Sequence, residues 1–100
     1  MIKHVVMWKL KAEAEGNDKN TNARLMKEKL EALKGLVPGM LTLEVGLDLG
    51  IDASAYDVIL YMEFEDQLAL QAYQAHPEHK AVFPFIGAVR ESRVAVDYEL

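Results

Sequence analysis

The densest group of side chains able to do chemistry is the segment Tyr73-Gln74-Ala75-His76-Pro77-Glu78-His79, at a predicted break between helices. Imidazole changes its charge near neutral pH, and a phenol can donate a hydrogen bond to an oxygen that becomes negative during a reaction. A histidine beside a tyrosine therefore offers a base and an acid, which suits enolisation or other carbon-acid chemistry. The structural alternative is that Tyr73 is a core aromatic and His76 caps the next helix.

A metal site on the same segment is the alternative chemistry. His76 and His79 stand three residues apart, and Glu78 or His4 would extend the set of ligands. A proline separates the two histidines across a helix boundary, however, and no carboxylate falls at an obvious fourth position. We therefore predict no metal centre, and the loop at 33–38 offers only backbone carbonyl oxygens to a hard cation.

Two further polar residues lie within apolar strand patterns. His4 alternates in phase with the apolar residues of the first predicted strand, so it is either a hydrogen-bonded core histidine or one wall of a pocket. Arg93 has the phase opposite to its apolar neighbours, which would direct a cation toward the helices to contact an anion. An ion pair with Glu44 or Asp48 is the alternative for this arginine.

Composition narrows the classes of function. The chain has 100 residues, 51% of them hydrophobic, which predicts a single domain over 1–100. Eleven Lys and Arg stand against 16 Asp and Glu, and the net charge of -5 disfavours nucleic acid and anionic membranes as partners. No segment has the length of a membrane span or the pattern of a signal peptide, so we expect a cytoplasmic protein.

Missing residue types and motifs exclude other chemistry. There is no cysteine, which removes disulfides, thiolate metal ligands and thiol nucleophiles, and which fits a reducing compartment. The sequence also lacks a glycine-rich phosphate loop, a serine nucleophile elbow and a dinucleotide fingerprint. We therefore expect neither a kinase nor a serine hydrolase nor a nicotinamide enzyme, and no bound cofactor.

Four segments alternate apolar and polar residues with the period of a strand, and two helical regions separate them. The predicted strands are 2–10, 41–49, 56–64 and 92–98. The second and third follow each other closely and should pair as a hairpin.

The first helical region carries apolar residues at spacings of three and four over 23–37 and stops at the glycines and proline of 35–39. Its cap is one of three polar residues, Asn17, Asp18 or Thr21.

The second helical region begins after Asp66 and breaks at His76, because the residue before a proline avoids the helical conformation. Pro77 opens a further helix that runs toward Ile86. Pro84 should kink or end that helix, since it lacks an amide donor.

The order β-α-β-β-α-β predicts an α+β, ferredoxin-like fold, in which helices cover one face of a four-stranded antiparallel sheet. The face toward the helices, which would line a pocket, carries Val6, Trp8, Val58, Leu60 and Met62, with Leu43 and Val45. The other face collects Val5, Met7, Ile59, Tyr61, Val94, Val96 and Tyr98. An exposed patch that is this apolar marks an interaction surface. We therefore predict a homodimer in which the sheets of the two chains pack against each other.

Four stretches resemble the stress-responsive A/B barrel domain (Dabb) family of the dimeric α/β barrel superfamily. They are Ile2-Lys3-His4-Val5-Val6-Met7-Trp8-Lys9-Leu10, Leu36-Val37-Pro38-Gly39 followed by Val45-Gly46, Tyr73-Gln74-Ala75-His76-Pro77-Glu78-His79, and Val96-Asp97-Tyr98-Glu99. The Tyr-x-x-His-Pro-x-His pattern is the most specific of them. The resemblance covers nearly the whole chain and implies a homodimer whose two sheets close into a barrel with the helices outside.

The resemblance also implies roles for particular residues. The family includes plant cyclases that close linear polyketides by aldol condensation in a cavity between sheet and helices. The tyrosine and the second histidine that act there match Tyr73 and His79, and a strand histidine bordering the cavity matches His4. Val58 stands where the cyclases present a further histidine, which makes the pocket here more apolar.

Two functions from different classes remain. In the first, His79 is the base, Tyr73 the hydrogen-bond donor and His4 an orienting group that act on a small hydrophobic, polyketide-like carbonyl ligand without a cofactor. In the second, the dimer of a non-enzymatic, stress-associated protein is itself the functional unit. The protonatable pair favours the enzyme, whereas Val58 and the short chain favour the structural protein.

Overall fold

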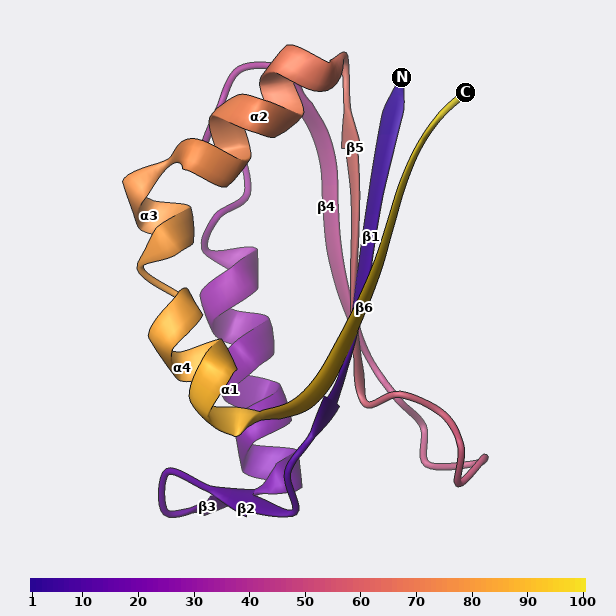
Figure 1. Ribbon diagram of the computed structural model, residues 1–100, viewed down its shortest axis with the longest axis vertical. Coiled ribbons are helices and arrows are strands. Elements are labelled where there is room, and N and C mark those ends of the chain that lie inside the picture. The colour runs from indigo at the N-terminus through magenta and orange to yellow at the C-terminus, as the bar shows by residue number, and fades with distance from the viewer.

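A computed structural model describes all 100 residues, and its main sheet has helices on one side (Figure 1). The main strands run antiparallel in the order β4-β5-β1-β6, so the ferredoxin-like α+β fold is confirmed. A hairpin of two short strands, which the sequence did not predict, precedes α1. The elements are β1 Ile2–Leu10, β2 Glu13–Ala14, β3 Asn17–Asp18, α1 Lys19–Glu31, β4 Met40–Leu47, β5 Val58–Phe64, α2 Gln67–Ala75, α3 Pro77–Lys80, α4 Phe83–Val89 and β6 Arg90–Glu99.

Strand β1 shows how the alternating sequence divides the sheet into two faces. Val6, Trp8 and Leu10 are buried toward the helices, whereas Met7 between them is exposed. The predicted hairpin of the second and third strands is present as the β4–β5 pair. The strand predicted over 41–49 is shorter in the structure, and Leu41 and Leu49 at its two ends are exposed, because the register shifts at Leu41 and the strand ends at Leu47.

Helix α1 begins where its capping residue predicts. The Asp18 side chain accepts a hydrogen bond from the Thr21 amide at 2.8 Å, which satisfies one of the free donors at the helix start. The helix ends at Glu31, earlier than the glycines that were predicted to stop it, and continues as a series of turns. Leu33 and Val37 are still buried, because these turns pack against the hydrophobic core.

The second helical region consists of three short helices. Asp66 caps α2 by accepting from the Ala69 amide, and His76 leaves the helical conformation immediately before Pro77, as predicted. The helix that begins at Pro77 does end before Pro84, at Lys80. Pro84 itself lies in the first turn of a further helix, α4, where a missing amide costs no hydrogen bond. Gly87 lies inside that helix and does not end it.

The two faces of the sheet have different surroundings. All helices cover one face, where 20 buried apolar residues form a continuous core, and the opposite face is bare (Figure 1). The bare face exposes Met7, Ile59, Val94, Val96 and Tyr98. The loop between β4 and β5 projects away from the helices on this side and carries the exposed Leu49 and Ile51 (Figure 1). No helix is long and apolar enough to cross a membrane.

Candidate functional site

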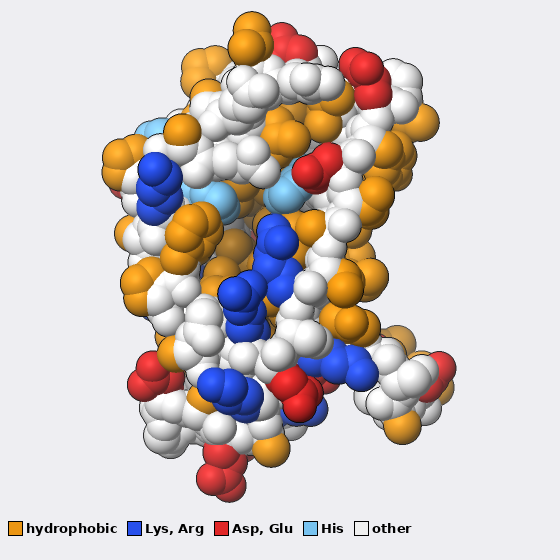
Figure 2. All heavy atoms as spheres, viewed as in Figure 1, with side chains coloured by type: hydrophobic (Ala, Val, Ile, Leu, Met, Phe, Trp, Pro, Cys, Tyr) orange, Lys and Arg blue, Asp and Glu red, His pale blue; other side chains and the backbone are white.

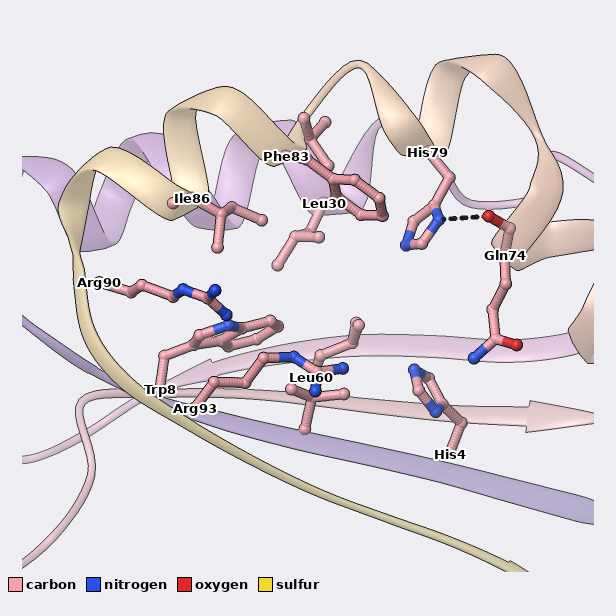
Figure 3. A pocket seen from close by; sticks show the side chains of 13 residues that line it. His4, Trp8, Leu30, Leu60, Gln74, His79, Phe83, Ile86, Arg90 and Arg93 are labelled. Atoms are coloured by element: carbon pink, nitrogen blue, oxygen red, sulfur yellow. Dashed lines mark hydrogen bonds between the residues drawn. The ribbon is translucent and has the colours of Figure 1, made fainter.

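A pocket of about 430 Å³ lies between the sheet and the helices. Figure 2 looks into this hollow, which has histidine side chains at one end and basic side chains across its mouth. Strands β1, β5 and β6 form its floor and the helices form its roof (Figure 3). Its lining residues are His4, Val6, Trp8, Leu30, Leu60, Gln74, His79, Val82, Phe83, Ile86, Gly87, Arg90 and Arg93.

His79 lies on α3 with one ring nitrogen bonded to the protein and the other facing the pocket (Figure 3). Its Nδ1 is 3.3 Å from the Gln74 carbonyl oxygen. Because a carbonyl only accepts, Nδ1 carries the proton of the neutral ring and Nε2 keeps its lone pair. Burial lowers the pKa of His79, the bond to Gln74 opposes this, and the charges of His4 and Arg93 lower it further. A neutral imidazole with a free Nε2 is the form that a general base requires.

Tyr73 packs near both histidines of the pocket without lining it. Its ring centroid is 4.3 Å from that of His79 and 6.5 Å from that of His4. The side chain is fully buried, and its hydroxyl has no hydrogen-bond partner. Burial raises the pKa of this phenol far above its ordinary value of 10.0, so the hydroxyl remains a protonated donor. Tyr73 is thus a core aromatic, as the structural alternative for this residue proposed, and its hydroxyl is buried with the ring.

His4 combines the two alternatives that the sequence left open. Its Nδ1 forms a hydrogen bond with the carboxylate of Asp97, which is its register partner on β6. The side chain is almost fully buried, and it also forms part of the pocket wall. The carboxylate therefore holds the imidazole in one orientation, and the other ring nitrogen remains available to the pocket.

Three of the five apolar residues predicted to line the pocket do so, namely Val6, Trp8 and Leu60. The prediction is wrong for Val58 and Met62, which share that face but belong to the closed core. In the register, Leu60 lies opposite the small Val6, whereas Met62 and Val58 lie opposite His4 and Trp8. The pocket wall at these two positions is formed by the β1 partners, His4 and Trp8.

Two arginines of β6 line the pocket, and the sequence predicted only one of them. Arg93 lies opposite Trp8 and lines the pocket, and it forms no ion pair with Glu44 or Asp48. Those acids belong to the β4 edge of the sheet, which two strands separate from β6. Arg90 was not predicted at all, because it lies at the junction of α4 and β6 outside the alternating pattern.

The structure separates the histidines of the Tyr-x-x-His-Pro-x-His segment. The Nδ1 atom of His76 accepts a hydrogen bond from the Glu78 amide at 3.1 Å and so caps α3, as the structural alternative for this residue proposed. Of the two histidines in this segment, only His79 lines the pocket. No group of three or more His, Asp or Glu side chains is arranged to hold a metal ion.

The whole chain matches one protein family. The model of the stress responsive A/B barrel domain family matches residues 2–100. The chain belongs to this family. No curated protein matches the sequence closely enough to suggest an activity.

Solved structures with this fold include dimers. A dimeric ferredoxin-like protein of unknown function from Bacteroides fragilis is 32% identical, with a TM-score of 0.84 over 99% of this chain and 95% of that one. A dimeric protein of unknown function from Thermobifida fusca is 25% identical, with a TM-score of 0.84 over 99% and 90%. A hydroxynitrile lyase from Passiflora edulis shares the fold at 17% identity, with a TM-score of 0.78 over 99% and 92%.

Proposed function

We propose that this Dabb protein is a cytoplasmic homodimer that performs cofactor-free acid–base chemistry on a small, apolar carbonyl compound. The observation that carries the proposal is the position of His79. It is half-buried, its Nδ1 is occupied by the Gln74 carbonyl, and its Nε2 faces a mainly apolar pocket. A base in such a site is shielded from water without being inaccessible.

The reaction would begin with proton transfer from carbon. Nε2 of His79 takes the proton on the carbon next to the carbonyl group, and the electron pair of that C–H bond forms an enolate. A hydrogen bond from the Tyr73 hydroxyl, which has no acceptor in the protein, would stabilise the enolate oxygen, and His4, held by Asp97, would orient the ligand. The enolate carbon then either recovers a proton from His79 or forms a C–C bond to a second carbonyl carbon, whose oxygen takes that proton.

The dimer in this proposal forms through the bare face of the sheet. Register pairs place Val5 between Tyr61 and Val96, so apolar side chains extend across three strands. The exposed Leu49 and Ile51 of the β4–β5 loop add to this surface. Relatives of this fold are described as dimeric, which supports an assembly that removes these side chains from water.

The second candidate is a stress-associated protein whose dimer is its function. The burial of the Tyr73 hydroxyl outside the pocket lining favours this candidate, because a donor must reach the ligand to act on it. In this case His79 and Tyr73 serve packing, through their 4.3 Å ring contact.

Histidine NMR and proton exchange test the enzyme proposal together. We expect added aromatic and polyketide-like ketones to shift the His79 resonances but not those of His76, which lies outside the pocket. A ketone that binds should exchange its α-protons for deuterium, and His79→Gln should slow this exchange by about a hundredfold or more. His76→Gln is the matched control. If no ketone shifts the His79 resonances, or if His79→Gln leaves exchange unchanged, the dimer is the better explanation.

A further inference from the structure

Two guanidinium groups share the pocket without a counter-ion. Arg90 and Arg93 both line it, and neither forms an ion pair or a side-chain hydrogen bond within the protein. No Asp or Glu is among the lining residues, although acids outnumber bases in the whole chain. Arg90 and Arg93 are both exposed to solvent, so their charges are accessible at the pocket, and an anion bound beside them would be attracted by both.

A buried donor at the same end of the pocket also lacks a partner. Trp8 is 4% exposed, and its Nε1 has no hydrogen-bond acceptor. It is the register partner of Arg93, so the indole and this guanidinium extend from neighbouring positions on the same face. A buried N–H that is left unpaired in the protein destabilises it, unless a ligand supplies the acceptor.

The two ends of the pocket differ in chemistry. Figure 3 shows the side chains of Arg90 and Trp8 at one end and those of His4 and His79 at the other, with the Arg93 side chain extending from the Trp8 end toward the middle of the pocket. Trp8 and His4 are four residues apart on β1, which separates their backbones by about 13 Å. The space between them is bordered mainly by apolar side chains, including Val6, Leu60 and Phe83.

We propose that the ligand is a keto acid, whose carboxylate binds Arg90, Arg93 and the Trp8 indole while its carbonyl group lies beside His79. This deepens the proposed function, on which it rests, by naming the substrate class. The distance between the two ends requires an apolar chain or ring of several bonds between the acid and the ketone. The mainly apolar lining suits one anionic group on an apolar body, in contrast to a polyphosphate.

A matched pair of probes tests the charge directly. The acid 5-oxo-5-phenylpentanoate and its primary amide have the same shape, but only the acid is anionic. By calorimetry we expect the acid to bind the wild-type protein at least tenfold more tightly than the amide. Arg93→Gln and Arg90→Gln should each weaken binding of the acid by about tenfold and leave the amide unchanged. Arg24→Gln, which removes the same charge from α1 outside the pocket, is the control.

Trp8→Phe tests the indole separately. It removes the N–H but keeps an aromatic ring, so binding of the acid should weaken while the fold is retained. An acid that binds no better than the amide, or that binds equally to wild type and to both arginine variants, overturns the keto-acid proposal. Arginine-dependent binding with α-proton exchange that is unaffected by His79→Gln would instead support this inference and contradict the proposed base. The two failures are therefore distinguishable.

Discussion

The two faces of the sheet differ in whether particular polar side chains have hydrogen-bond partners. On the face under the helices, the Tyr73 hydroxyl and the Trp8 indole N–H are buried without partners. On the bare face, the carboxylate of Glu63 accepts hydrogen bonds from the Tyr61 hydroxyl at 2.7 Å and the Thr42 hydroxyl at 3.0 Å. These three polar side chains of the bare face are therefore satisfied within one chain and can meet another surface without new partners. The covered face retains donors without acceptors, and one of them, the indole N–H, belongs to Trp8, which lines the pocket.

The largest predicted effect comes from placing a charge on the bare face. Val96 lies opposite Val5 in the apolar patch, and Val96→Asp would put a carboxylate without a partner into the proposed interface. We expect the dimer dissociation constant to rise by about a hundredfold or more, measured by sedimentation equilibrium. Ala72→Asp, at an exposed position of α2, should leave it unchanged. An unaltered dimer in Val96→Asp would show that the chains associate through another surface.

The same conservative substitution should have opposite effects on the two faces. Tyr73→Phe removes a buried hydroxyl that has no partner, and we expect it to raise the free energy of unfolding by about 1 kcal/mol. Tyr61→Phe removes a hydroxyl bonded to Glu63 and should lower it. Urea unfolding at equal protein concentrations measures both, with Tyr56→Phe as the control. If Tyr73→Phe destabilises the protein, its hydroxyl has an acceptor in solution, and the contrast between the faces is lost.

The smallest effect is a dependence of stability on pH that arises on the covered face. The pKa of His79 in the folded protein lies below its ordinary value of 6.5, so the unfolded chain binds a proton more readily. The stability that this contributes is complete above pH 6.5 and is lost as the pH falls through the folded-state pKa. Unfolding midpoints at pH 7.5 and 5.5 should therefore differ less in His79→Gln than in wild type or in His76→Gln. An equal difference in all three would assign the pH dependence to other groups.

Local patterns predicted the fold because each signal acts over a few residues. Alternation assigned the strand faces, Asp18 and Asp66 supplied caps, and the His76–Pro77 pair marked a helix break. The failures lie where a tertiary contact or position outweighs the local signal. Pro84 is compatible with a helix because it lies in the first turn of α4, where a backbone amide would have no partner within the helix.

The candidate site was predictable only in part. His4 and His79 could be assigned to a pocket from strand phase and from the resemblance, but strand phase also selected Val58 and Met62. Neither lines the pocket, whereas their β1 partners Trp8 and His4 do, and no pattern within β5 reports which side chains lie on the neighbouring strand.

By itself, the sequence determined the order of the elements, the apolar character of both sheet faces and the segment that carries His79, because periodicity, capping and proline act locally. Only the tertiary structure decided that Arg90 and Arg93 meet Trp8 in one cavity and that the Tyr73 and Trp8 donors lack partners. These residues are far apart in the chain, and the strand order together with the course of the three short helices brings them together.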